Sequence, residues 1–119
     1  MKGVKNLSDV SLIVYAVPDM TKAKPFFRAL VGSDPYADTP YYVGYKNGEM
    51  EIGLVPQGTS AAPGGLAYWT VGDIASSVQA LVDAGGEIVQ QITDVSNGLL
   101  VASVKDPNGA IVGMRQFPR

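Results

Sequence analysis

The sequence contains the same pattern twice, and this repetition limits what the chain can fold into. One apolar, strand-like run ends at Val17-Pro18-Asp19, and a second ends 54 residues later at Val71-Gly72-Asp73. A hairpin-forming Asn-Gly pair comes later in each half, at Asn47-Gly48 and at Asn108-Gly109. The pattern predicts an internal duplication of a βαβββ unit. Because one helix on a small sheet cannot bury its apolar face alone, the two units should pair, with both helices on one side.

Two helices and several strands are expected within this duplication. Runs rich in β-branched and aromatic residues predict strands over 10–17, 36–45, 49–55, 66–71, 87–95, 99–105 and 110–114. In the strand over 49–55, Met50, Ile52 and Leu54 share one face, while Glu51 and Gly53 lie on the other. The face with three large apolar side chains should belong to the core.

Each expected helix has a clear start and end. Apolar residues recur at helical spacing up to Gly32 in the first helix, and Pro25 should fall in its first turn, which places the helix start near residues 21–24. Phe26 and Phe27 of this helix should pack in the core. In the second helix, Asp73 should be the N-cap and Gly85-Gly86 should end the apolar stripe. That stripe comprises Ile74, Val78, Leu81 and Val82.

Composition excludes several classes of function. The chain has 119 residues, a net charge of -2, no Cys and no His. Without these residues there are no disulfides, no thiolate nucleophile and no Cys- or His-based metal site. The basic residues are scattered, which argues against nucleic acid as a partner. No apolar run reaches membrane-spanning length and no signal peptide is evident, so we expect a cytoplasmic protein that does not contact membranes.

The chain is long enough for one domain, 1–119, with a real core. Its two modules should cover about residues 7–56 and 66–117. The breaker-rich segment 57–65 should be the linker between them.

The order of these motifs resembles the vicinal oxygen chelate superfamily, which includes glyoxalase I, bleomycin-binding resistance proteins and extradiol dioxygenases. The residues that carry the resemblance are the two junctions ending at Asp19 and Asp73, the helix exit at 84–87, and Lys105-Asp106-Pro107-Asn108-Gly109-Ala110 before the last strand. The resemblance implies an α+β fold in which two paired βαβββ modules form a cupped, mostly antiparallel sheet with the helices outside. It also implies a homodimer.

Metal-dependent members of that superfamily place His, Gln or Glu ligands at four strand positions facing the cup. In this sequence those positions fall at Leu12, Gly53, Leu66 and Gly113. None of these side chains coordinates a metal, and a catalytic metal site typically needs three protein ligands. The resemblance therefore points to a metal-free branch with no bound cofactor, and glyoxalase or dioxygenase chemistry is not expected.

Strand alternation from these four positions predicts which other side chains line the cup. The expected ligand-binding residues are Leu12, Val14, Glu51, Gly53, Leu66, Tyr68, Ile111 and Arg115, with Ala16, Val55 and Thr70 on the same faces. An apolar wall with a few polar groups is typical of a small-molecule pocket. Tyr68 suits a planar ligand, Glu51 a cation, and Arg115 either a carboxylate or Glu51 itself. The tyrosines of residues 36–45 lie beside the cup and suit either ligand or dimer contacts.

Three hypotheses follow. The first is a metal-free protein that binds a hydrophobic or aromatic small molecule, such as an antibiotic, without catalytic residues. The second is an enzyme of the same fold, of the lyase, isomerase or dioxygenase type, with an unconventional site around Glu51 or a displaced metal site at Glu49 and Glu51. The third is an interaction module whose cavity is filled by its own side chains.

Overall fold

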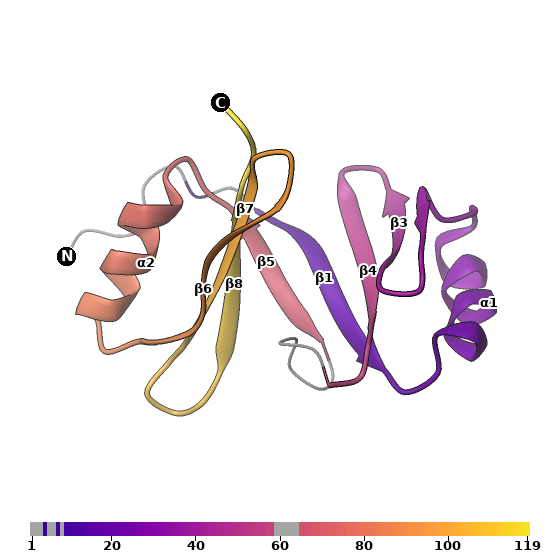
Figure 1. Ribbon diagram of the computed structural model, residues 1–119, viewed down its shortest axis with the longest axis horizontal. Helices are drawn as coiled ribbons and strands as arrows, with labels where there is room; N and C mark the ends of the chain where they lie inside the picture. Colours follow the sequence, from indigo (N-terminus) through magenta and orange to yellow (C-terminus); the bar gives the residue numbers. More distant parts are fainter. Residues whose placement is uncertain (1–3, 5–6, 8, 59–64) are drawn as a thin grey trace. The chain divides into compact units, whose positions relative to one another are not determined.

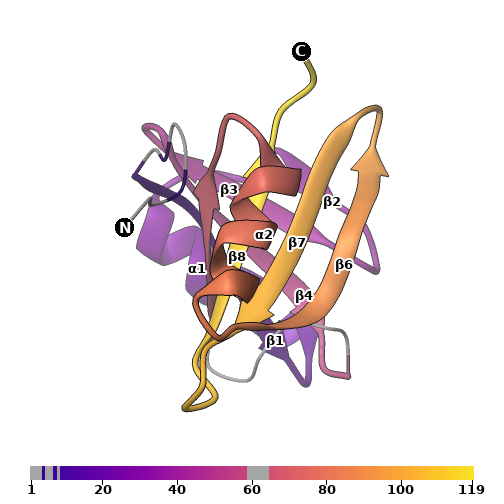
Figure 2. The ribbon, with the colours of Figure 1, turned by 90° about the vertical axis from the view of Figure 1, so that its left-hand side faces the viewer.

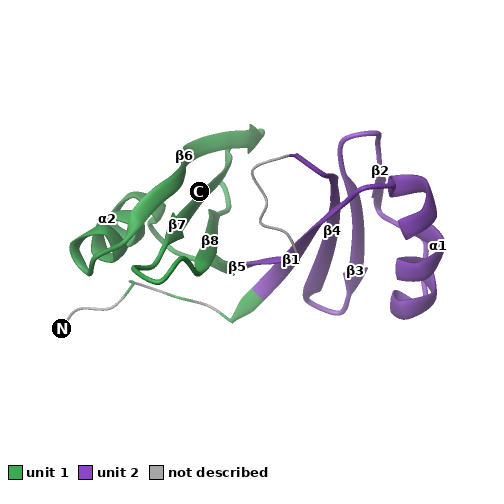
Figure 3. Ribbon diagram, turned by 90° about the horizontal axis from the view of Figure 1, so that it is seen from below, with its two compact units in different colours: residues 1–10, 68–119 green, residues 11–67 purple. Residues whose placement is uncertain are grey.

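The computed structural model describes residues 4, 7, 9–58 and 65–119. It divides the chain into two compact units, shown in two colours in Figure 3. Unit 1 takes in residues 68–119 together with the start of the chain up to Val10, and unit 2 covers Ser11–Ala67. Most of the predicted linker lies outside the described residues.

Unit 2 carries the first βαβββ succession (Figure 1). Its elements are β1 (Val10–Val17, whose first residue falls in unit 1), α1 (Met20–Val31), β2 (Ala37–Asp38), β3 (Val43–Asn47) and β4 (Met50–Pro56). The strand order is β2-β3-β4-β1, with β1 parallel to β4 and the other neighbours antiparallel. The turn at Gly48, with a φ of 63°, joins β3 to β4 as the Asn-Gly pair predicted.

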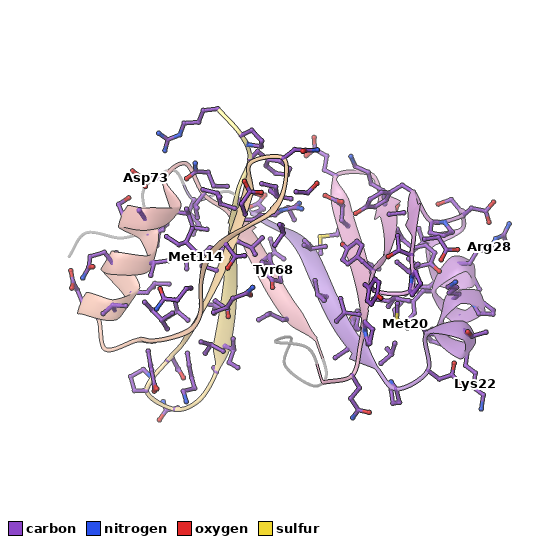
Figure 4. All side chains as sticks on the ribbon, in the orientation of Figure 1. Met20, Lys22, Arg28, Tyr68, Asp73 and Met114 are labelled. Carbon is purple, nitrogen blue, oxygen red and sulfur yellow. The ribbon has the colours of Figure 1, made fainter. Side chains whose placement is uncertain are left out.

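Helix α1 covers one face of this sheet. Val43, Tyr45 and Leu54 are buried there, and Ile52 and Phe27 pack against them, so the predicted core face of β4 is confirmed. Figure 4 labels Met20, which also packs against this cluster from the first turn of α1. The hydroxyl of Tyr45, at the centre of the cluster, donates to the Lys24 carbonyl oxygen at 3.1 Å. This hydrogen bond satisfies a polar group inside an apolar core.

Two details of α1 differ from the sequence prediction. The helix begins at Met20, capped by Asp19, whose side chain accepts from the Lys22 amide, so Pro25 lies in the second turn and not the first. Phe26 is 66% exposed and does not belong to the core, because the residues facing the sheet follow the i, i+4 row of Ala23, Phe27 and Val31. The end of the helix at Gly32, in the left-handed conformation, is as predicted.

Unit 1 carries the second succession: β5 (Leu66–Thr70, whose first two residues fall in unit 2), α2 (Ile74–Asp83), β6 (Glu87–Ser96), β7 (Leu99–Lys105) and β8 (Ile111–Gln116). The strand order β5-β8-β7-β6, with β5 parallel to β8, repeats that of unit 2. Figure 2 shows α2 crossing one face of this sheet.

The predicted stripe of α2 packs against that sheet. Ile74 and Val78 are buried with Ala102, Val104 and Met114, and the latter methionine is labelled in Figure 4. Asp73 caps the helix by accepting from the Ser76 amide, as expected. The fold is therefore α+β, with two helices and eight mostly antiparallel strands in the described residues.

Candidate functional site

Each unit has a helix-free face, defined here as the side of its sheet that its own helix does not cover. In unit 2 this face carries Leu12 and Val14 of β1 beside Glu51 and Gly53 of β4, because parallel partners in register point the same way. Leu12 and Val14 are buried and Glu51 is half-buried. Four of the predicted ligand-binding residues are thus neighbours on one surface.

Two glycines on this face are covered by tyrosine rings. Gly44 and Gly53 are register partners on β3 and β4. A Cβ at Gly44 would lie 2.5 Å from Cζ of Tyr36, and one at Gly53 would lie 2.5 Å from the hydroxyl oxygen of Tyr42. Since real Cβ atoms do not approach other atoms so closely, only glycine lets both rings lie against the sheet.

The seated ring of Tyr36 reaches the carboxylate on the same face. Its hydroxyl donates to Oε1 of Glu51 at 2.6 Å, a short, charge-assisted hydrogen bond. The pKa of Tyr36 is raised, first by partial burial of its hydroxyl and next by hydrogen bonds with Glu51 and Tyr42. The helix-free face of unit 2 therefore presents aromatic rings and a carboxylate held by a neutral phenol.

The helix-free face of unit 1 contains the equivalent arrangement. Gly113 of β8 is the register partner of Tyr68 on β5, and a Cβ at Gly113 would lie 2.6 Å from Cδ2 of the tyrosine. The close atoms here include Cγ at 2.8 Å, so the base of the ring covers the glycine, not its tip. Tyr68, labelled in Figure 4, is buried, so this ring has little room to move.

Two buried polar side chains share this face with Tyr68. Arg115 is 5% exposed, and its guanidinium carbon lies 4.8 Å from the ring centroid of Phe117, within cation–π range. Ser103, opposite Gly113 in the sheet, is 1% exposed, and its hydroxyl has no hydrogen-bond partner. A buried, unsatisfied hydroxyl is uncommon in folded proteins and calls for an explanation.

The residues present do not fit the metal site that the resemblance implies. Leu12, Gly53, Leu66 and Gly113 offer no donor atoms, and tyrosine rings occupy the space that a side chain at either glycine would need. Among the described residues, no three His, Cys, Asp or Glu side chains gather in a cluster able to hold a metal ion. This chain offers no coordination sphere at those positions.

The remaining predicted residues, Leu66 and Ile111, lie on strands β5 and β8. Leu66 is buried and Ile111 is partly exposed. The structure adds Ser103 to the candidate site. Of the tyrosines expected beside the cup, Tyr36 and Tyr42 lie over glycines of the helix-free face of unit 2, whereas Tyr45 is buried in the core against α1. Alternation places Gly44 of β3, and Tyr42 just before this strand, on the side opposite the core residues Val43 and Tyr45. The sequence pattern could therefore have indicated the position of Tyr42.

The sequence of this chain matches a known protein family. Residues 10–114 match the Glyoxalase family, described as the glyoxalase/bleomycin resistance protein/dioxygenase superfamily. The chain belongs to this superfamily. The span takes in both βαβββ successions, so the resemblance seen in the motifs is confirmed.

Curated relatives in the glyoxalase superfamily include the "Putative glyoxylase CFP32" of Mycobacterium bovis and of Mycobacterium tuberculosis. Each is 29% identical to this chain over 112 residues, which cover 85% of this chain. The chain spans only 42% of the length of these relatives.

Solved structures confirm the glyoxalase-like fold at low sequence identity. Methylmalonyl-CoA epimerase from Mycobacterium tuberculosis aligns with a TM-score of 0.76 at 13% identity, covering 100% of this chain and 94% of that one. A superfamily member from Vibrio splendidus 12B01 gives a TM-score of 0.67 at 14% identity, covering 88% and 96%. Neither helix in the described part of the chain has the length and apolarity to cross a membrane.

Proposed function

We propose that this superfamily member is a metal-free protein that binds and sequesters a hydrophobic or aromatic small molecule, such as an antibiotic, on its helix-free faces. The observation that carries the proposal is the seating of tyrosine rings on Gly53 and Gly113. Where metal-dependent relatives would have ligating side chains, this chain places aromatic surface.

The chemistry of the helix-free faces suits such a ligand. The buried side chains of Leu12 and Val14 form an apolar floor on the face of unit 2, and the rings of Tyr36 and Tyr42, which are not buried, offer flat surfaces for stacking. Few polar groups accompany them: the Glu51 carboxylate in unit 2, and the Arg115 guanidinium and Ser103 hydroxyl in unit 1. A largely apolar wall with a few fixed polar groups is typical of small-molecule sites.

A thermal-shift screen against planar antibiotics and other aromatic metabolites tests the proposal. A compound that binds the native state stabilises it by an amount that grows with the logarithm of the free ligand concentration relative to Kd, and this raises the melting temperature. We expect at least one compound to give a concentration-dependent rise. If no compound across a broad panel stabilises the protein, sequestration is the wrong function and the interaction module becomes the better account.

The second candidate is an enzyme that uses Glu51, and the hydrogen bond from Tyr36 is the observation that favours it. A carboxylate and a phenol 2.6 Å apart can pass a proton between ligand and protein. Mass spectrometry of a bound compound after long incubation separates the two functions. Recovery of the unchanged compound supports binding. Conversion that disappears in Glu51→Gln would establish the enzyme instead.

A further inference from the structure

Three Asn-Gly pairs lie at turns between strands. Asn47-Gly48 joins β3 to β4, Asn97-Gly98 joins β6 to β7, and Asn108-Gly109 lies between β7 and β8. The pair suits a tight turn, and it is also chemically reactive. Because glycine has no Cβ to block the approach, its main-chain nitrogen can attack the side-chain amide carbon of the asparagine before it.

The glycine amides of two pairs are held by hydrogen bonds. The Gly98 amide donates to both carboxylate oxygens of Asp94 at 3.1 Å. The Gly109 amide donates to the Asp106 carbonyl oxygen at 3.1 Å. Such a nitrogen must lose its hydrogen bond before it can turn toward the preceding side chain, and this loss raises the barrier to attack. Local structure therefore protects Asn97 and Asn108.

Gly48 differs from the other two glycines. It is exposed, and its amide donates no hydrogen bond to any residue in the described ranges. A Cβ at this position would meet no atom within 4 Å, so the turn is open. Asn47 is also exposed and ends β3, where it pairs with Met50. Only this last pair of the hairpin has to open for the Gly48 nitrogen to reach Cγ of Asn47, and strand ends open readily.

We propose that Asn47 is a site of deamidation in the folded protein, whereas Asn97 and Asn108 are protected. The Gly48 nitrogen bonds to Cγ of Asn47, and the side-chain nitrogen leaves as ammonia with the amide proton, which closes a succinimide ring. Water then opens the ring. Opening at Cγ leaves aspartate at position 47. Opening at the main-chain carbonyl carbon leaves isoaspartate, in which the main chain runs through Cβ and Cγ.

The isoaspartyl product changes the connection that holds the helix-free face of unit 2. The short turn after Asn47 sets the register of β3 against β4, in which Gly44 lies opposite Gly53. In that register the two glycines lie under the rings of Tyr36 and Tyr42. A methylene group added to the main chain at the turn works against this register. Deamidation should therefore loosen the seating of both rings.

Peptide mapping of the aged full chain tests the proposal. Folded protein is incubated at mildly alkaline pH and digested at acidic pH, and mass spectrometry compares the three asparagines in one sample. We expect Asn47 to convert at least about tenfold faster than Asn97 or Asn108, a difference of about 1.4 kcal/mol in the barrier. In concentrated urea the three rates should be similar. Folded protein in which Asn47 does not convert, or converts no faster than the other two, would overturn the proposal.

Asp94→Ala tests the cause of the protection, because it removes both acceptors of the Gly98 amide. Conversion of Asn97 should rise at least about tenfold, with Asn47 unchanged. Asp83→Ala is the matched control: its carboxylate accepts from Gln79 on α2, away from the turns, so all three rates should stay as in the wild type. An unfolded variant would speed all three sites together. An unchanged rate at Asn97 in a folded Asp94→Ala protein would contradict protection by hydrogen bonding.

Asn47→Asp separates the effect of the new charge from that of the longer main chain. The isoaspartyl fraction can be isolated from aged protein by ion exchange, since deamidation adds a negative charge. We expect this fraction to unfold at a lower urea concentration than the wild type, and Asn47→Asp to unfold close to the wild type. Equal unfolding of the isoaspartyl protein and the wild type would show that the register of β3 and β4 tolerates the change, against the proposed effect on the tyrosines.

Discussion

Units 1 and 2 have the same topology but use it for different side-chain chemistry. Both run strand, helix and three strands, and both place a tyrosine ring on a glycine of their last strand. In unit 2 the ring of Tyr42 covers Gly53 with its hydroxyl end, while in unit 1 Tyr68 covers Gly113 with the base of its ring. The two repeats therefore share the packing of a tyrosine ring on a glycine, although the polar groups around it differ.

The polar groups on the two helix-free faces have opposite charge. Unit 2 carries Glu51, which accepts a hydrogen bond from Tyr36, whereas unit 1 carries the buried Arg115 and the unpartnered Ser103. The shared strand topology explains why both units have a glycine on the last strand and why side chains alternate between the two faces of each sheet. The charged group differs between the two units although their topology is the same. The side chains on each face, and not the fold, therefore decide what that face binds.

The largest expected difference between the units is the cost of filling each glycine. Gly113→Ala should lower the free energy of unfolding by about 2 kcal/mol, because a buried ring blocks the new methyl group. Gly53→Ala should cost less than half as much, since the tip of the Tyr42 side chain can move outward. Urea denaturation of both variants measures this. Equal losses would mean that the two rings are held alike.

A matched pair of buried serines should give the next largest difference. The Ser77 hydroxyl donates to the Asp73 carbonyl oxygen at 2.6 Å, so Ser77→Ala should cost about 1 kcal/mol. Ser103 is equally buried and has no partner, so Ser103→Ala should change stability by less than about 0.5 kcal/mol. Chemical unfolding of the two variants decides this, and a large loss in Ser103→Ala would reveal a partner for that hydroxyl.

The smallest expected effect concerns Tyr36 at alkaline pH. Its pKa is raised in the folded state, so the associated stability is fully present below the ordinary tyrosine pKa of about 10 and falls as the pH rises above it. Wild-type protein should lose more stability than Tyr36→Phe as the pH rises from about 9.5 to about 11.5. Parallel pH curves for the two proteins would contradict the hydrogen bond to Glu51.

Most of the fold could be predicted from local chemistry. Turn residues, helix caps and alternation located the hairpins, the N-cap Asp73 and the core face of β4, because each is set by a few neighbouring residues. The exposure of Phe26 could not be predicted in this way, since it depends on which row of α1 meets the sheet.

The candidate site was only partly predictable. Alternation placed Leu12, Val14, Glu51 and Gly53 on one face, as found. The seating of Tyr36 on Gly44 joins a residue before β2 to one in β3, and no local pattern indicates such a contact. Burial of Arg115 likewise depends on packing across strands, which a single strand sequence does not specify.

Calorimetric titration of an aromatic ligand from the screen, with excess chelator present, tests the central claim most directly. If tyrosine surface replaces a metal site, chelator should leave Kd unchanged, and Tyr42→Ala should weaken binding at least about tenfold, a loss of about 1.4 kcal/mol. Tyr41→Ala is the control, because Tyr41 is 79% exposed and adjacent in the chain. Binding that requires a divalent metal would contradict the account. So would an equal loss of affinity in Tyr42→Ala and Tyr41→Ala.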